Sequence, residues 1–277
     1  MSHDGIHDLI ASWRLPRGGT LLERIERMVE PTILAGHFGS STTQLVSGLQ
    51  YHLGGHHDTR QLADLADLGP GDHVLDVCCY LGGPAVQLSD SYGCRVTGID
   101  IAEPTITAAD RIAALAGLRD RLHYCVADAL RLPFGDSAVD VVWDQGSLAH
   151  DAAWLREFDR VLRPGGRLAL VFEIRPAMTS PEPDDRRWTL AQTVARVREM
   201  GYRIEHADDL TEREITLGWE RLLRRLDERR DVYSTARGKT WVDAARGAFQ
   251  REIVAMQQGA WSNGRLVARK ECAKEGQ

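Results

Sequence analysis

The chain has 277 residues, 43% of them apolar and 27% charged, which suits one large folded domain or a domain with an added cap. Its formal net charge of −6 argues against a nucleic-acid-binding protein, because such proteins usually carry a net positive charge. No apolar run approaches the roughly 20 residues of a membrane span, and the N-terminus lacks the order of a secretory signal. Together with five cysteines that include no Cys-x-x-Cys pair, these features favour a reducing cytoplasm.

Residues 1–60 are expected to form a helical N-terminal cap. The segment "TLLERIERMVEPTI" (20–33) has the apolar spacing of a helix. Two glycine-containing stretches, "GHFGSSTTQ" (36–44) and "YHLGGHHD" (51–58), then interrupt that pattern.

Residues 61–175 alternate short apolar strands with amphipathic helices. Strands are predicted at 73–79, 95–101, 122–129, 139–144 and 167–174, and helices at 82–92, 103–118 and 152–162. Three of these strands are nearly continuous apolar runs, as parallel strands buried on both faces require. The order predicts an α/β fold with a doubly wound, Rossmann-like sheet and right-handed crossovers.

Residues 176–277 are expected to complete a seven-stranded sheet. After a Pro-rich break at 175–185, a helix is predicted at 188–201 and a strand at 202–209. Two helical stretches follow, at about 211–231 and 237–258, and then a last strand at 264–270 that should pair antiparallel. Helices inserted before the last strand are a natural lid for the open end of the sheet, so we expect a lid at about 211–258.

The stretch "DVCCYLGG" (76–83) lies where such a sheet binds its ligand, beyond the first strand. A nucleotide-binding loop here normally reads Asp-x-Gly-x-Gly-x-Gly, but Cys78 and Tyr80 occupy two of the three glycine positions. Asp76 and the glycines before the next helix still fit a cofactor cradle. At the end of the second strand, Asp100 can accept hydrogen bonds from a ribose diol, and a helix N-cap is the alternative role.

Three further segments resemble a known family. They are "VADALRLPF" (126–134), "LPFGDSAVDVVWDQGSLAH" (132–150) and "EFDRVLRPGGRLAL" (157–170). The series resembles the class I S-adenosylmethionine-dependent methyltransferases. It is most similar to the small-molecule branch that contains glycine, sarcosine and dimethylglycine N-methyltransferases and tocopherol-type methyltransferases. The resemblance covers about residues 50–175 strongly and the remainder less specifically.

The resemblance implies that S-adenosylmethionine is the cofactor, and it suggests positions for its contacts. It places Asp76, Gly82 and Gly83 around the methionine part, and Cys78 of the same loop is also expected at the cofactor. Asp100 is expected at the ribose with Ile101 beside it, and Asp128 with Ala129 at the adenine. Asp144 would face the methionine amino group through backbone or side chain, and Tyr51 would close over the carboxylate. Tyr80 is expected to rim the methionine or acceptor pocket, unless the loop rotates and the ring turns to solvent or packs under the cap. His150 is a candidate general base, or a residue that only orients its loop.

These features predict methyl transfer to a small-molecule acceptor, such as a specialised metabolite or an amine. The alternatives are a different reaction with the same cofactor, such as a cyclisation or rearrangement, and a non-catalytic ligand-binding protein. No nucleic acid or membrane partner is expected, and a homodimer is compatible with the sequence. No metal is expected, although a Cys78 thiol nucleophile and a metal site at His52, His56 and His57 stay open as minor alternatives.

Overall fold

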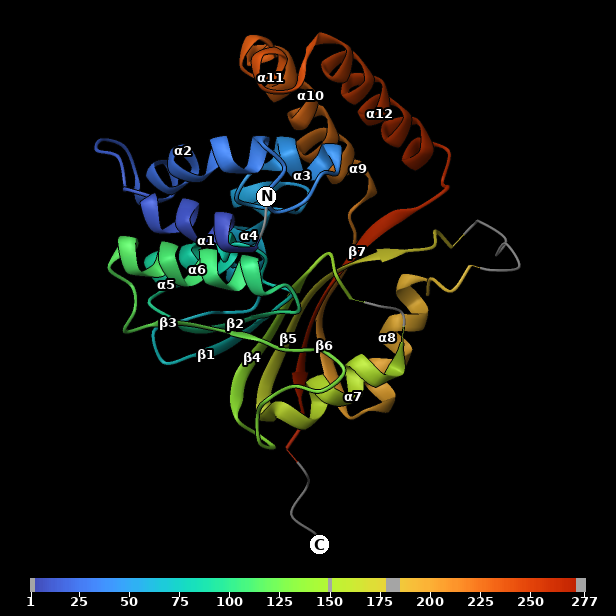
Figure 1. Ribbon diagram of the computed structural model, residues 1–277. Coiled ribbons are helices and arrows are strands. Elements are labelled where there is room, and N and C mark those ends of the chain that lie inside the picture. Colours follow the sequence, from blue (N-terminus) through green and yellow to red (C-terminus); the bar gives the residue numbers. More distant parts are fainter. Residues whose placement is uncertain (1–2, 149–150, 178–184, 273–277) are drawn as a thin grey trace, which may run out of the picture.

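The computed structural model describes residues 3–148, 151–177 and 185–272, and its described strands form one seven-stranded sheet (Figure 1). The strands are β1 (His73–Val77), β2 (Arg95–Asp100), β3 (Leu122–Val126), β4 (Val139–Gln145), β5 (Leu162–Ile174), β6 (Tyr202–Asp209) and β7 (Ser262–Lys270). Their order across the sheet is β3-β2-β1-β4-β5-β7-β6. β1 to β5 pair in parallel, while β7 lies antiparallel to both β5 and β6. The predicted α/β fold with an antiparallel last strand is confirmed.

Helices cover both faces of the sheet, as the buried strands require. They are α4 (Gly55–Leu65), α5 (Gly83–Tyr92) and α6 (Glu103–Ala116) on one face, with α7 (Ala152–Val161) and α8 (Leu190–Glu199) on the other (Figure 1). Successive strand residues point to opposite faces. Val74 and Val141 therefore pack in the core under the first set, while Leu75 and Val142 pack in the core under the second.

The N-terminal segment forms helices α1 (His3–Ser12), α2 (Leu21–Leu34) and α3 (Thr42–Ser47) above α5 and α6 (Figure 1). A capping box at Thr20 and Glu23 begins α2, and Ile25 and Val29 bury its apolar face. Helix α4 begins at Gly55 and crosses the boundary expected at residue 60. The glycine pair that looked like an interruption instead begins this helix, since Gly54 adopts a left-handed φ of 79° as its N-cap.

The segment between β6 and β7 is helical, but its division differs from the two stretches that were expected. It contains α9 (Thr211–Arg213), a short π-helix η1 (Glu214–Trp219), α10 (Glu220–Glu228), α11 (Arg230–Arg237) and α12 (Lys239–Gln257). The first expected helical stretch is interrupted at Arg229. Helix α11 therefore covers the residues where a connection between the two stretches was expected. Trp219, Leu222 and Phe249 of these helices belong to a separate apolar core, which also includes Leu34 of α2 and Val46 of α3. The helices reach over the cap in Figure 1.

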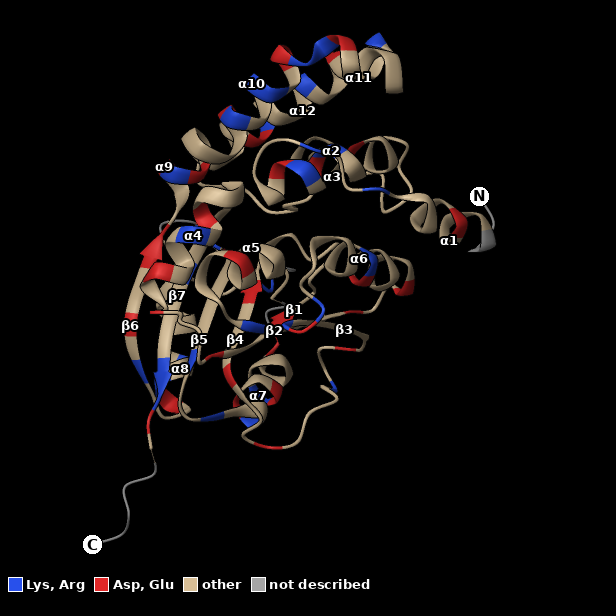
Figure 2. Ribbon diagram, turned by 90° about the vertical axis from the view of Figure 1, so that its left-hand side faces the viewer, with Lys and Arg blue, Asp and Glu red and all other residues tan. Residues whose placement is uncertain are grey.

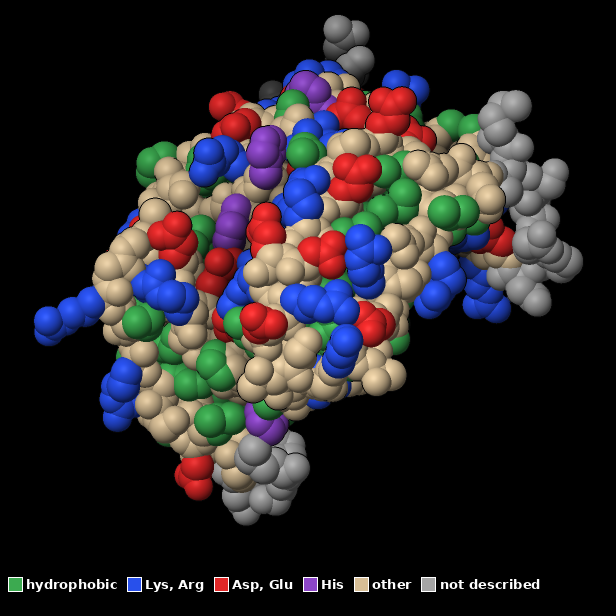
Figure 3. Space-filling model, turned by 90° about the horizontal axis from the view of Figure 1, so that it is seen from above, with side chains coloured by type: hydrophobic (Ala, Val, Ile, Leu, Met, Phe, Trp, Pro, Cys, Tyr) green, Lys and Arg blue, Asp and Glu red, His purple; other side chains and the backbone are tan. Residues whose placement is uncertain are grey.

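Charges of both signs are spread over these upper helices (Figure 2). The view from above likewise shows blue and red side chains interspersed, without a large patch of one sign among the described residues (Figure 3). Several of the arginines in this segment bind carboxylates of the cap and of α4. Glu30 of α2 pairs with Arg225 and Arg229, and Asp58 of α4 accepts a 2.8 Å hydrogen bond from Arg213 Nε. Within the described ranges, no helix is both long enough and apolar enough to cross a membrane.

Candidate functional site

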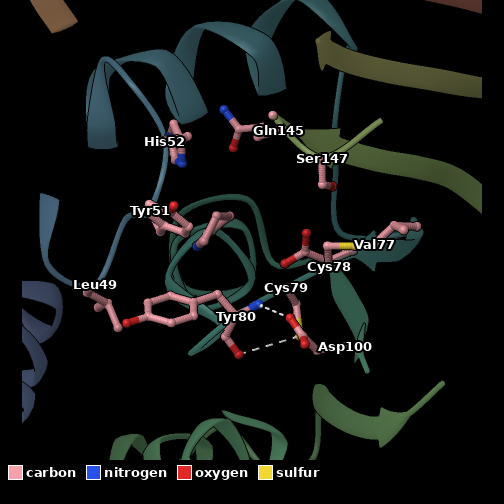
Figure 4. Close-up of a pocket in the computed structure, with 13 residues that line it drawn as sticks. Leu49, Tyr51, His52, Val77, Cys78, Cys79, Tyr80, Asp100, Gln145 and Ser147 are labelled. Carbon is pink, nitrogen blue, oxygen red and sulfur yellow. Dashed lines mark hydrogen bonds between the residues drawn. The ribbon is translucent and has the colours of Figure 1, made fainter. Parts of the chain in front are cut away.

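A pocket opens at the carboxyl ends of β1 and β4, on either side of the point where strand order reverses (Figure 4). Such a reversal is where open α/β sheets bind their ligands. The pocket holds about 690 Å³ of empty space, its open mouth included. Its walls are Leu49, Tyr51, His52, Asp76, Val77, Cys78, Cys79, Tyr80, Pro84, Asp100, Gln145, Gly146 and Ser147.

The loop after β1 keeps the backbone path of a glycine-rich loop. Cys78, Tyr80 and Gly82 have φ angles of 56°, 51° and 73°, so all three adopt the left-handed region. This region costs a side-chain-bearing residue roughly 1–2 kcal/mol. Surrounding bonds hold the strained residues in place: Cys79 N donates to Ile99 O (2.9 Å), and Gly82 N donates to Cys79 O (2.8 Å). The loop has therefore gained two side chains without losing its shape.

Gly82 and Gly83 are both needed for space, and Gly82 is also needed for its positive φ. A Cβ on Gly82 would collide with the Tyr124 side chain, and a Cβ on Gly83 would lie 2.5 Å from the backbone oxygen of Leu49. The second contact is with the segment that leads to α4. The glycine pair thus allows α5 to begin directly against the segment that forms one wall of the pocket.

The Tyr80 ring lies in the pocket wall and packs beneath the cap. It is 9% exposed, and its ring is tilted against that of Tyr51, with centroids 5.5 Å apart. Its hydroxyl is buried and has no hydrogen-bond partner among the described residues, and burial raises the pKa of this phenol. The ring does not point to solvent.

Asp100 joins the ends of β1 and β2. Its Oδ2 accepts a hydrogen bond from Tyr80 N (3.1 Å), and its Oδ1 accepts one from Ala102 N (2.9 Å). The N-cap of α6 is Ala102, so Asp100 does not take the helix-cap role that was its alternative. Each carboxylate oxygen has a second lone pair and can accept another hydrogen bond from a ligand in the pocket.

Two buried carboxyl groups lie behind the loop. Asp76 is 3% exposed, and burial, together with Asp144 and Asp100, raises its pKa well above the usual range. Asp144 is fully buried, and burial raises its pKa to about 6 although Ser147 Oγ (2.6 Å) and the amides of Ser147 and Leu148 (3.1 Å each) donate to it.

The side chain of Asp144 does not line the pocket. Asp144 was expected to face the ligand through its backbone or its side chain, and the side-chain alternative is corrected here. Its carboxylate folds back onto the following turn and holds that turn in place. The neighbours Gln145, Gly146 and Ser147 line the pocket instead. Sequence reasoning missed them as site residues, because the direction of a side chain at a strand end depends on the turn that follows.

The residues expected at the adenine lie outside the pocket walls. Asp128 is exposed and accepts a hydrogen bond from Leu130 N (2.9 Å), while Ala129 is buried. Ile101 is 73% exposed, and Val126 and Leu130 are also exposed apolar side chains. Because Asp100 pairs with Val126 across β2 and β3, these apolar side chains gather at the ends of neighbouring strands.

The minor alternatives receive no support from the geometry. Cys78 is exposed within the open pocket. Partial burial there, together with the nearby carboxyl groups of Asp144 and Asp100, raises the pKa of its thiol to about 12, and a thiol that stays protonated at neutral pH is a poor nucleophile. His56 and His57 bind Glu26 and Arg213, respectively, and the described part of the chain contains no group of three metal-ligating side chains. The candidate base His150 lies outside the described residues.

Residues 74–166 match the protein family described as "Methyltransferase domain". The 27-O-demethylrifamycin SV methyltransferase of Amycolatopsis mediterranei is 37% identical over 169 residues, which cover 56% of this chain and 62% of that protein. The chain spans less than two thirds of the length of the first curated relatives it matches.

Two solved structures share the fold at low sequence identity. Phosphoethanolamine N-methyltransferase 2 of Haemonchus contortus, solved with phosphomonomethylethanolamine and S-adenosylhomocysteine, has a TM-score of 0.74 at 17% identity, covering 92% of this chain and 61% of that one. The [4+2]-cyclase SpnF has a TM-score of 0.68 at 22% identity, covering 94% and 100%. The sequence match and the shared fold agree with the resemblance drawn from the motifs: residues 74–166 match a methyltransferase domain, and the chain is similar to small-molecule S-adenosylmethionine-dependent methyltransferases of class I.

Proposed function

We propose that the protein binds S-adenosylmethionine at the loop after β1 and transfers its methyl group to a small-molecule acceptor. The observation that carries this proposal is the left-handed path kept at Cys78 and Tyr80. Two strained residues are retained only where the surrounding structure holds them, and such positions concentrate at functional sites.

The pocket residues fit the polar parts of this cofactor. Asp76 Oδ2, Tyr80 Oη and Gln145 Nε2 are buried atoms without hydrogen-bond partners in the described structure, and all three residues line the pocket. Buried polar atoms are normally paired, so these atoms favour a polar ligand. The methionine amino group would suit the Asp76 carboxyl, since a positive charge offsets the repulsion between buried carboxylates.

The nucleoside would lie at the ends of β2 and β3. Asp100 has free lone pairs for the ribose hydroxyls. The exposed side chains of Ile101, Val126 and Leu130 would be covered by the adenine ring, and Asp128 with Ala129 would lie at its edge. These assignments use the loop ends of three neighbouring strands, as the fold requires.

Once bound, S-adenosylmethionine supplies a methyl group on a positively charged sulfur. The protein's own contribution is to position the acceptor in line with that methyl group and to exclude water. The rings of Tyr51 and Tyr80 pack at a tilt against each other in the pocket wall, and Leu49 and His52 from the N-terminal segment line the same pocket. We infer that residues 1–60 and 211–258 select the acceptor, because they supply the parts of the molecule beyond the cofactor-binding sheet.

The acceptor class follows from the relatives. One is named for its action on 27-O-demethylrifamycin SV and others for phosphoethanolamine, which supports a specialised metabolite or an amine as the acceptor. Location in the cytoplasm and assembly as a homodimer stay predictions.

A different reaction with the same cofactor is the second candidate. The substituted glycine positions at Cys78 and Tyr80 favour it, and the fold is also found in a [4+2]-cyclase. The two candidates differ in their products, since only methyl transfer adds a methyl group to the acceptor and releases S-adenosylhomocysteine.

The test is incubation of the purified protein with methyl-labelled S-adenosylmethionine and a panel of phenols, alcohols, amines, carboxylates and activated-carbon compounds, analysed by mass spectrometry. Labelled product with S-adenosylhomocysteine supports the proposal. Substrate conversion without label supports the second candidate. Cofactor binding in calorimetry without conversion of any compound supports a non-catalytic ligand-binding protein.

A further inference from the structure

A network of polar side chains lies at one end of the pocket, around Thr59 of α4. The Thr59 hydroxyl is 3.0 Å from Gln145 Oε1, 3.3 Å from Gln50 Oε1 and 3.1 Å from His52 Nε2. Figure 4 shows the side chains of His52 and Gln145 near one another, across the pocket from Tyr80 and Asp100. His52 and Gln145 both line the pocket.

The positions of the protons in this network follow from which atoms can donate. The Trp143 indole N–H can only donate, and it lies 3.1 Å from Gln145 Oε1, so this atom is the amide oxygen. The Thr59 hydroxyl has a single proton and faces the oxygens of Gln145 and Gln50, which only accept. That proton is therefore given to an amide oxygen, and Thr59 has none left for His52.

His52 Nε2 must then carry a proton of its own. The backbone oxygen of Gly55, which can only accept, lies 3.2 Å from Nε2. Both contacts of Nε2, with Gly55 O and with Thr59 Oγ1, are satisfied when Nε2 donates. In a neutral imidazole the other nitrogen, Nδ1, is then an acceptor. Nδ1 has no hydrogen-bond partner within the described ranges, and its residue lines the pocket.

The charges around His52 favour the neutral ring. Burial, with smaller contributions from Arg221 of α10 and His56 of α4, lowers its pKa to about 4, although the hydrogen bond with Gly55 acts in the opposite direction. Glu26 of α2 hydrogen-bonds to His56 instead of His52. At neutral pH, His52 thus holds an unprotonated Nδ1 in a fixed orientation.

We propose that His52 Nδ1 accepts the proton of a hydroxyl group as that group is methylated, which makes oxygen the methylated atom. This inference rests on the proposed function. The oxygen–carbon bond forms as the carbon–sulfur bond breaks, and the electron pair of the broken bond stays on sulfur. The hydroxyl proton moves to Nδ1 and later to water, so His52 returns to its neutral form.

The weak basicity of His52 distinguishes oxygen from nitrogen as the acceptor atom. An oxygen that gains a methyl group becomes a strongly acidic oxonium, and even a weakly basic imidazole takes its proton. An amine that gains a methyl group becomes an ammonium ion with a pKa near that of lysine, far above that of His52. His52 would take no proton from such an aliphatic ammonium ion, so a base of this kind suits a hydroxyl acceptor and not an aliphatic amine.

The first test reads the tautomer directly and needs no activity. Nitrogen-15 NMR of the whole protein should show His52 with a protonated Nε2 and an unprotonated Nδ1, unchanged between pH 6 and pH 8 in accord with a pKa of about 4. Thr59→Ser should keep this tautomer, while Thr59→Val should weaken the Nε2–H hydrogen bond. A protonated Nδ1 in the parent protein would overturn the proposal.

The second test uses the acceptor panel described above. His52→Gln should lower kcat for hydroxyl acceptors by on the order of 100-fold, with the dissociation constant of S-adenosylmethionine nearly unchanged. Imidazole added to His52→Ala should restore part of the rate, which a merely structural role would not allow. The control is His123→Gln, an exposed residue of β3, which should match the parent protein.

The outcomes separate this inference from the proposed function. If the parent methylates hydroxyl compounds and His52→Gln turns over at the parental rate, the inference fails and the proposed function stands. If the parent protein methylates amines only, the inference likewise fails and the proposed function stands. If the parent methylates no compound of the panel, both fail.

Discussion

The backbone amide of Tyr80 donates a 3.1 Å hydrogen bond to the carboxylate of Asp100. This bond ties a left-handed residue of the loop after β1 to the end of β2. The carboxylate that we assign to the ribose thus also holds the loop that we assign to the methionine part. Binding of the two halves of the cofactor is therefore coupled through one side chain, and changes on either side should be felt on the other.

The first prediction concerns Asp100 itself. Asp100→Ala should weaken S-adenosylmethionine binding by roughly 1.5–3 kcal/mol, because it removes charge-assisted hydrogen bonds to the ligand and also frees the loop. Isothermal calorimetry measures the loss, and the exposed Asp120→Ala is the matched control. Unchanged affinity in Asp100→Ala would remove Asp100 from the cofactor site.

The second prediction concerns strain at Cys78. Cys78→Gly should raise the free energy of unfolding by roughly 1 kcal/mol, since glycine adopts a φ of 56° without the cost that a Cβ brings. Cys78→Ala should leave it nearly unchanged, because alanine keeps the Cβ. Chemical denaturation of both variants measures the difference, and equal stability of the glycine and alanine variants would show that the loop is not strained.

The third prediction concerns the Tyr80 ring in the pocket wall. Tyr80→Gly should change turnover by on the order of tenfold or more, about 1.4 kcal/mol in the barrier, because it opens the wall beside Tyr51. Tyr80→Phe should keep stability or raise it slightly, since the buried hydroxyl has no partner in the described structure. Parental affinity and turnover in both variants would make Tyr80 a bystander.

The fourth prediction is a pH dependence of stability from Asp144. Its pKa is about 6 in the folded protein and near 3.8 when unfolded, so between these values the folded protein holds a proton that the unfolded chain has lost. Stability should therefore fall as pH rises from about 4 to 6, by roughly 3 kcal/mol. Denaturation across this range should show the fall in the parent protein, and Asp144→Asn should reduce it. An equal fall in stability in the parent protein and in Asp144→Asn would show that other titratable groups cause it.

The fifth prediction concerns the helices at 211–258. Hydrogen exchange there should slow when cofactor and acceptor bind, since an occluded reaction needs a lid that opens. The ion pairs of Glu30 with Arg225 and Arg229 tie this segment to the cap. Glu30→Gln should therefore speed exchange in α10 and α11 of the free protein. Identical exchange with and without ligands would contradict the lid.

The sequence by itself determined the order of strands and helices, because apolar periodicity and turn residues are local signals. The predicted strand at 95–101 and the observed β2 (Arg95–Asp100) differ by one residue. The motifs also predicted the resemblance to methyltransferases, which the match over residues 74–166 supports, while the role of the loop after β1 as the ligand-binding loop stays a prediction. The glycine pair at the start of α4 is a local signal that can be interpreted in two ways. The glycines at 54 and 55 mark either an interruption or a helix start, and only the left-handed φ of Gly54 in the fold decides for the start.

The tertiary structure alone decided where side chains point and which polar atoms lie close together. Cys78 and Tyr80 keep a conformation that favours glycine because contacts from β2 hold the loop, and no local propensity would predict this. Asp144 turns away from the pocket because the following turn supplies its donors. The tautomer of His52 depends on Thr59 and, through it, on Gln145, 86 residues further along the chain. Hydrogen bonds of this kind form only when distant segments of the chain come together. The sequence therefore shows which donors and acceptors are present, but not which of them are partners.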